Sequence, residues 1–96
     1  MPNYVTLIKW TEEGVKNIKH SPDRLKAAQT LTEGLGGKLT AYMTMGEYDM
    51  VVISEAPSDE ACTAAMLAIA GRGFVRTVTM RAFTPAEFGE ILKHLP

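Results

Sequence analysis

The amino-acid sequence predicts an α+β protein of the ferredoxin-like class, with the element order βαββαβ, an antiparallel sheet and a short C-terminal helix. Four segments rich in β-branched and aromatic residues are separated by two segments of helical pattern, in the order strand, helix, strand, strand, helix, strand. The first and third of these strands are apolar on both alternating faces, which is expected of the two central strands of such a sheet.

The whole chain, residues 1–96, is predicted to be one domain, because this length leaves no room for a second core. With 46% hydrophobic and 22% charged residues, the chain is slightly rich in apolar side chains for so small a protein. The net charge of −1 comes from ten basic and eleven acidic residues spread along the chain. Nucleic acids and membranes are therefore not expected as partners.

The first half of the pattern begins with a strand over residues 3–10, whose apolar side chains occupy both faces. The next segment, 11–20, loosens this pattern and is assigned no regular element. Residues 21–37 are predicted to form a helix, with Ser21 as its N-cap and two glycines at its end.

A hairpin is predicted next. Residues 38–45 alternate between apolar and polar side chains, and residues 48–55 are apolar on both faces. Only Gly46 and Glu47 remain between them, so the two strands are expected to pair through a two-residue turn.

The last third holds a helix, a strand and a terminal helix. Pro57 and Ser58 are expected to open the helix, and Gly71 and Gly73 to end it. Residues 74–83 are predicted to form the last strand. Residues 84–95 are predicted to form a short helix with Thr84 as N-cap and a glutamate three residues on, which is a capping box.

Two helices cover only one face of a four-stranded sheet, and the apolar side chains on the other face also have to be hidden from water. The simplest cover is a second copy of the chain, packed sheet against sheet. A homodimer or higher even oligomer is predicted on this ground. The terminal helix carries Phe88, Ile91 and Leu92 on one side, which suits a helix that reaches over a neighbouring subunit.

Three blocks of sequence, MGEYDMVVISEAPSDEA, TLIKWTEEGVKNIKHSPDR and GRGFVRTVTMRAFT, resemble the GYD domain family. Its Gly-x-Tyr-Asp element is here Gly46, Tyr48 and Asp49. The resemblance implies a ferredoxin-like fold of the dimeric α/β-barrel kind, found mostly in bacteria and archaea, and it implies no particular reaction. Relatives by fold include cofactor-independent monooxygenases, muconolactone isomerases, haem-dependent chlorite-degrading enzymes and ligand-sensing domains, and fold alone does not choose among them.

The Gly-x-Tyr-Asp element has a structural and a functional interpretation. In the first, Gly46 supplies a positive φ for the turn, Tyr48 packs at the strand entry and Asp49 accepts hydrogen bonds. In the second, Asp49 takes a proton and Tyr48 steadies an oxyanion at a cavity between sheet and helices. The structural interpretation is preferred, because hairpin ends commonly need such residues and adjacent strand residues point to opposite faces.

His20 is a third catalytic candidate, as a general base, although a surface or capping role is preferred for a histidine without an identifiable carboxylate partner. Arg24 is expected to pair with a nearby acid, and a carboxylate ligand is the alternative partner. The predicted ligand-binding residues are Trp10, Thr11, Tyr42, Gly46, Tyr48 and Arg81. Each has a structural alternative: the Trp10 ring covers the edge of the core, the Thr11 hydroxyl caps a turn, and Arg81 is a strand-edge charge.

No metal or cofactor is predicted, because His20, Cys62 and His94 lack metal-ligand spacing and no dinucleotide fingerprint occurs. Cys62 is the only cysteine, which excludes an internal disulfide. The start, MPNYVTLIKW, lacks the features of a secretory signal and no apolar stretch is long enough to span a membrane, so a cytoplasmic location is expected.

Three functions remain open. The first is a small homo-oligomeric protein that binds a small apolar or aromatic molecule between sheet and helices. The second is a cofactor-independent enzyme of the monooxygenase or isomerase kind. The third is a purely structural or interaction module whose apolar sheet face serves assembly.

Overall fold

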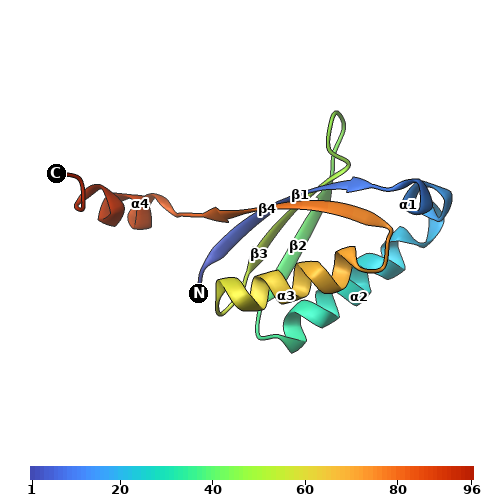
Figure 1. Cartoon of the computed structure of the whole chain (residues 1–96), viewed down its shortest axis with the longest axis horizontal. Coiled ribbons are helices and arrows are strands. Elements are labelled where there is room, and N and C mark those ends of the chain that lie inside the picture. Colours follow the sequence, from blue (N-terminus) through green and yellow to red (C-terminus); the bar gives the residue numbers. More distant parts are fainter.

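The computed structural model describes residues 1–96 and has the predicted βαββαβ order, with a helix at the C-terminal end (Figure 1). The elements are β1 (Asn3–Trp10), α1 (Glu12–Lys16), the 3-10 helix η1 (Ile18–His20), α2 (Ser21–Gly34), β2 (Lys38–Met43), β3 (Met50–Glu55), α3 (Asp59–Ala70), β4 (Val75–Ala82) and α4 (Pro85–Leu92). The ferredoxin-like fold class is confirmed.

The four strands form one sheet in the order β2-β3-β1-β4, and every neighbouring pair is antiparallel. The two strands that are apolar on both faces, β1 and β3, lie in the centre as predicted. The register places Thr6 of β1 opposite Val52 of β3 on one side and Thr79 of β4 on the other. Alternate residues of all four strands therefore share one face of the sheet.

Helices α2 and α3 lie side by side on one face of the sheet (Figure 1). On this covered face, Ile8, Met50, Val52 and Val75 form one buried cluster. A second buried cluster joins Tyr4 to three residues of α3 and to the residue after β3, namely Cys62, Ala65, Met66 and Ala56. The opposite face carries no element, and we call it the open face.

Helices α2, α3 and α4 differ in how their starts are capped. Ser58 accepts a hydrogen bond from the amide of Ala61 at the start of α3, and Thr84 and Glu87 form the predicted capping box of α4. The prediction that Ser21 is an N-cap is wrong: Ser21 is already helical and its side chain caps nothing. The reason is that η1 runs directly into α2, so no free helix start remains to be capped.

The segment 11–20 is more regular than predicted. Thr11 is the N-cap of the short helix α1, and its hydroxyl accepts a hydrogen bond from the amide of Gly14. Gly14 is buried, and a Cβ at this position would overlap the carbonyl oxygen of Phe74. Glycine is therefore required here by close packing.

The predicted two-residue turn at Gly46 and Glu47 is also wrong. Strand β2 ends at Met43 and β3 begins at Met50, so residues 44–49 form a longer loop, in which Gly46 has a φ of 102°. The physical reason lies at Asp49, whose amide donates to the carbonyl of Ile8 at 2.9 Å. This bond ties the end of the loop to the central strand β1. Across the base of the loop, the amide of Thr44 donates to the carbonyl of Asp49 at 3.0 Å.

The C-terminal part forms an arm that projects from the body. The chain leaves the sheet after Ala82, the last residue of β4 that pairs with β1, and α4 lies at the far end, away from the other helices (Figure 1). The molecule accordingly measures 51 × 31 × 18 Å. The arm exposes large apolar side chains, namely Phe83, Phe88, Ile91, Leu92 and Leu95. None of the helices has both the length and the apolar character required to cross a bilayer.

Candidate functional site

A groove of about 400 Å³ runs between α3 and β4 on the covered side of the sheet. It exists because β4 is the edge strand, so its helix-side residues Thr77 and Thr79 are only partly shielded. Half of its ten lining residues are hydrophobic, and the volume lies within the range typical of small-molecule sites. The groove therefore offers an amphipathic surface for a ligand.

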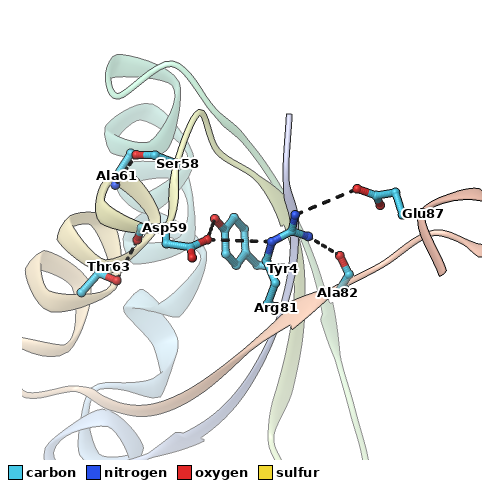
Figure 2. Close-up of polar contacts among 8 residues, drawn as sticks. All are labelled: Tyr4, Ser58, Asp59, Ala61, Thr63, Arg81, Ala82 and Glu87. Atoms are coloured by element: carbon cyan, nitrogen blue, oxygen red, sulfur yellow. Dashed lines mark hydrogen bonds and ion pairs between the residues drawn. The ribbon is translucent and has the colours of Figure 1, made fainter. Parts of the chain in front are cut away.

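One end of the groove is closed by a polar cluster of Tyr4, Asp59 and Arg81 (Figure 2). The hydroxyl of Tyr4 donates a hydrogen bond to the carboxylate of Asp59. Nε of Arg81 lies 3.8 Å from Oδ1 of the same carboxylate. Asp59 thus bridges a phenol and a guanidinium that come from two different strands.

Local structure explains how these side chains meet. Tyr4 and Arg81 are direct cross-strand partners in the β1–β4 ladder, and the guanidinium lies 5.7 Å from the centre of the Tyr4 ring. Asp59 is the first residue of α3, immediately after its N-cap Ser58. The positive end of the helix dipole stabilises a carboxylate at this position.

Arg81 also connects the body to the arm. Its Nη1 donates to the carbonyl of Ala82 at 2.6 Å, and its Nη2 lies 4.0 Å from Oε2 of Glu87 in α4 (Figure 2). The guanidinium stacks 4.7 Å from the ring centre of Phe83. The amide of Thr84 holds the pKa of Glu87 below its ordinary value, and Arg81 contributes to the same shift. This glutamate is therefore a charged partner for Arg81.

Two groups that line the groove, Tyr4 and Cys62, have raised pKa values. Burial, followed by the hydrogen bond to Asp59, raises the pKa of Tyr4 to about 12. Burial also raises the pKa of the Cys62 thiol, with a further contribution from the charge of Asp59. Tyr4 thus stays a neutral phenol, and Cys62 stays a thiol without nucleophilic character.

The Gly-x-Tyr-Asp loop lies apart from this groove. The carboxylate of Asp49 accepts a hydrogen bond from the amide of Trp10 at 2.9 Å, which fixes the end of β1. The ring of Tyr48 packs 5.2 Å from Nζ of Lys9, on the open-face side of the sheet. No atom lies near the place where Gly46 would carry a Cβ, so the positive φ alone favours glycine there.

The model of the GYD domain family matches residues 4–92, nearly the whole chain. The chain belongs to the GYD domain family. A similar protein is the "Glutamine synthetase and cystathionine beta-lyase binding protein" of Thermus thermophilus. It is 34% identical to this GYD protein over 95 residues, which is 97% of this chain and 100% of the relative.

Two solved structures share the fold. A crystal structure of a Thermus thermophilus protein has a TM-score of 0.57 and 22% identity, and covers 88% of this GYD protein and 95% of its own chain. An Arabidopsis thaliana protein has a TM-score of 0.58 and 13% identity, with the same coverage of 88% and 95%. At these identities the two structures support the ferredoxin-like fold alone.

The other candidate residues of this GYD protein are dispersed. Trp10 packs beside the Ile8 cluster on the covered face, whereas Tyr42 is exposed on the open face. The hydroxyl of Thr11 donates to the carbonyl of Gly73 at 2.5 Å. His20 is exposed, with Nδ1 3.9 Å from the carboxylate of Asp23. Of the predicted residues, only Arg81 lines the groove.

Sequence reasoning missed Tyr4 and Asp59. In the sequence pattern Tyr4 belongs with the apolar residues of its strand, and Asp59 has only a helix-dipole role. A usable signal was present, because a tyrosine near the start of β1 and an arginine near the end of β4 become neighbours in an antiparallel pair. No group of three or more His, Cys, Asp or Glu side chains in this structure is placed to hold a metal ion.

Proposed function

We propose that this GYD protein is a homo-oligomeric protein-interaction module that assembles through its open face. The observation that carries this proposal is a band of apolar side chains across all four strands. In the register of the sheet the band has two rows, which are Tyr42, Val51, Leu7 and Val78, and Thr40, Ile53, Val5 and Met80. Seven of these eight residues are apolar, and Val78 is 54% exposed in the single chain.

The composition of the open face supports this interpretation. Charged residues flank the apolar band, with Lys38 opposite Glu55 at one end and Lys9 opposite Arg76 at the other. An apolar centre with a charged rim is the usual anatomy of a protein–protein interface. A continuous apolar patch of this kind is rare on the free surface of a monomer.

The arm supports assembly as well. Helix α4 presents Phe88, Ile91 and Leu92 to solvent in the single chain, although a helix of this length is not stable on its own in water. We propose that this apolar side packs on the neighbouring subunit. Arg81 and Glu87 then set the angle at which the arm leaves the body.

The name of the Thermus relative favours a role in binding other proteins. We propose by analogy that the assembled GYD protein binds a metabolic enzyme of the same kind. Glutamine synthetase and cystathionine β-lyase from the same genome are the first partners to test by biolayer interferometry. The module is expected to bind at least one of them.

Sedimentation velocity across a range of protein concentrations tests self-association directly. The wild-type chain is expected to sediment as an even oligomer, and Ile53→Lys as a monomer, because a second sheet would bury the new charge. Ile53 is 43% exposed, so the lysine can reach water in the free chain and folding is preserved. The matched control is Ala64→Lys, at an exposed position of α3. A monomeric wild-type chain, or an oligomer that Ile53→Lys leaves intact, would contradict the proposal.

A second candidate function is binding of a small molecule in the groove beside α3. It is favoured by the volume of about 400 Å³ and by the polar end formed by Tyr4, Asp59 and Arg81. Native mass spectrometry of the purified protein is expected to show added mass that Arg81→Met loses and Arg76→Met keeps. Bare subunits in both spectra would remove this candidate.

The enzymatic alternative has weaker support. The carboxylate of Asp49 is occupied by a backbone amide, and His20 is exposed with Asp23 as its neighbour. It would require turnover that Asp49→Asn or His20→Ala abolishes while circular dichroism shows an intact fold.

A further inference from the structure

Helix α4 lies away from α2 and α3, with its apolar side exposed to solvent (Figure 1). Phe88, Ile91 and Leu92 are all exposed, although they recur at the spacing of a single helical side. The capping box of Thr84 and Glu87 defines the start of this helix, but eight residues are too few for stability in water without packing. The apolar side of α4 therefore needs a surface to pack on.

The groove between α3 and β4 is an open surface of matching character. Its apolar lining comes mainly from α3, where Met66, Leu67 and Ala70 border it, and Leu67 is 70% exposed. Because β4 is the edge strand, no further strand closes the groove on that side. A helix that approaches from beyond the edge of the sheet can therefore pack against α3 in this groove.

The arm of the same chain points away from this groove. The arm leaves the sheet after Ala82, beside the polar end of the groove, and runs towards the far end of the molecule (Figure 1). Arg81 stabilises this direction, because its guanidinium donates to the carbonyl of Ala82 and stacks on Phe83. A second copy can supply α4 instead, and two copies that exchange their arms fill both grooves.

Charge and helix direction indicate how α4 of the second copy lies. Asp59 stands at the start of α3, at one end of the groove, and its side chain is 72% exposed. Lys93 follows directly after the last residue of α4. If α4 runs antiparallel to α3, Lys93 comes close to Asp59 and the two helix dipoles attract each other. The length of α4, about 12 Å, lies within that of α3, about 18 Å.

We propose that α4 of a second copy packs in the groove between α3 and β4, with its apolar side against Leu67 and Ala70 and with Lys93 near Asp59. This inference rests on the proposed function, because it names the surface on which the arm of the neighbouring subunit packs. In such an assembly α4 occupies the groove. The inference and the binding of a small molecule in the groove therefore exclude each other.

Cysteine cross-linking between two variants tests the exchange. Native Cys62 is replaced by alanine in both, and then Leu67→Cys places a thiol in the groove of one chain and Leu92→Cys places one on α4 of the other. Residues 67 and 92 are exposed, so both variants are expected to fold. After mixing, a short bismaleimide is expected to join one chain of each variant, as mass spectrometry shows. The control is Lys26→Cys, at an exposed position of α2 outside the groove, which is expected to give no product with Leu92→Cys.

The double variant with Leu67→Cys and Leu92→Cys in one chain separates exchange from closure of an arm on its own body. Products of two chains are expected. A product within single chains only, or a mixture of the single variants that gives no product while the wild type sediments as an even oligomer, would overturn the inference.

A charge in the groove tests the same contact in the otherwise native chain. Leu67→Glu is expected to weaken self-association at least about tenfold, because the apolar side of α4 would bury the new carboxylate. Ala68→Glu, at the next exposed position of α3 and outside the groove, is expected to leave association unchanged. If Ile53→Lys gives monomers but Leu67→Glu assembles like the wild type, the groove contact is refuted and open-face assembly stands. A monomeric wild-type chain would refute both.

Discussion

The two faces of the sheet are built from alternate residues of the same four strands, yet they differ in what covers them. On the covered face Val52 is 2% exposed and packs beneath the helices, whereas on the open face its chain neighbour Ile53 is 43% exposed. Both side chains are β-branched and aliphatic. The difference shows that an apolar residue in a strand predicts a side chain that must be shielded from water. It does not show which element or chain shields it.

The polar residues of the two faces differ as well. The covered face buries Thr6 completely, with its hydroxyl 3.0 Å from that of Thr79, and places Tyr4 and Arg81 at its edge. The open face keeps its charges at the two ends of the apolar band. Three of these polar residues, Tyr4, Thr79 and Arg81, line the groove, whereas the charges of the open face lie beside its apolar band.

The largest effect is expected at Gly14, where α1 lies against the backbone of Phe74. Gly14→Ala places a Cβ against the carbonyl oxygen of Phe74, which also accepts the amide of Thr11 at 3.0 Å. Because backbone has to move to relieve the overlap, the free energy of unfolding is expected to fall by about 3 kcal/mol. Urea denaturation measures the loss, and Gly34→Ala, where nothing lies near the added methyl group, is the control.

The next effect tests the packing of the covered face. Val52→Ala removes two methyl groups from the centre of the core and is expected to lower the free energy of unfolding by about 2 kcal/mol. The measurement is urea denaturation at a protein concentration low enough for the monomer. A loss below about 0.5 kcal/mol, which is typical of surface positions, would show that this face is loosely packed.

The order of elements was predictable because it depends on local patterns. Alternation identified the strands, caps and glycines bounded the helices, and two strands with apolar residues on both faces correctly indicated the centre of the sheet. One error fell where a tertiary contact overrides local sequence, because the amide of Asp49 bonds to β1 at the end of the 44–49 loop. The other lies at the start of α2, where η1 directly precedes the helix in the chain.

The candidate site was far less predictable, for the same physical reason. Residues 4, 59 and 81 meet only once the strand register and the position of α3 are fixed, and neither can be obtained from periodicity. The partner of Arg24 is likewise set by packing, because its Nη1 donates to the carbonyl of Asn17 at 2.9 Å. The expectation that Arg24 pairs with a nearby acid is wrong, because no Asp or Glu lies within ion-pair distance. The Gly-x-Tyr-Asp element, in contrast, was conspicuous in sequence, and its aspartate binds a backbone amide.

A smaller effect is expected at the edge of the covered face, where Asp59 is largely exposed and can exchange partners with water. The folded pKa of Tyr4, about 12, lies above the ordinary value of 10.0, so between these pH values the unfolded chain binds fewer protons. The contribution of Tyr4 to stability is therefore complete below pH 10 and declines as the pH rises towards 12.

Absorbance at 295 nm is expected to show a late ionisation step for Tyr4, near its pKa of about 12. Tyr4→Phe is expected to remove this late step and to flatten the fall in stability between pH 10 and 12. Tyr48→Phe, at the exposed loop, is the control and keeps the late step. Absence of this late step from the wild-type titration would mean that Tyr4 is open to water.

The smallest effect is expected from the same substitution on the open face, at Val78. Val78→Ala removes the same two methyl groups as Val52→Ala, but from a side chain that is 54% exposed, so dilute protein is expected to lose less than about 1 kcal/mol. At high protein concentration the loss is expected to grow, because a second sheet would bury this side chain and association adds to the stability of the folded state. The same urea experiment at two concentrations separates the faces: Val52→Ala costs the same at both, and Val78→Ala does not. A loss at Val78 that is independent of concentration would mean that the open face faces water.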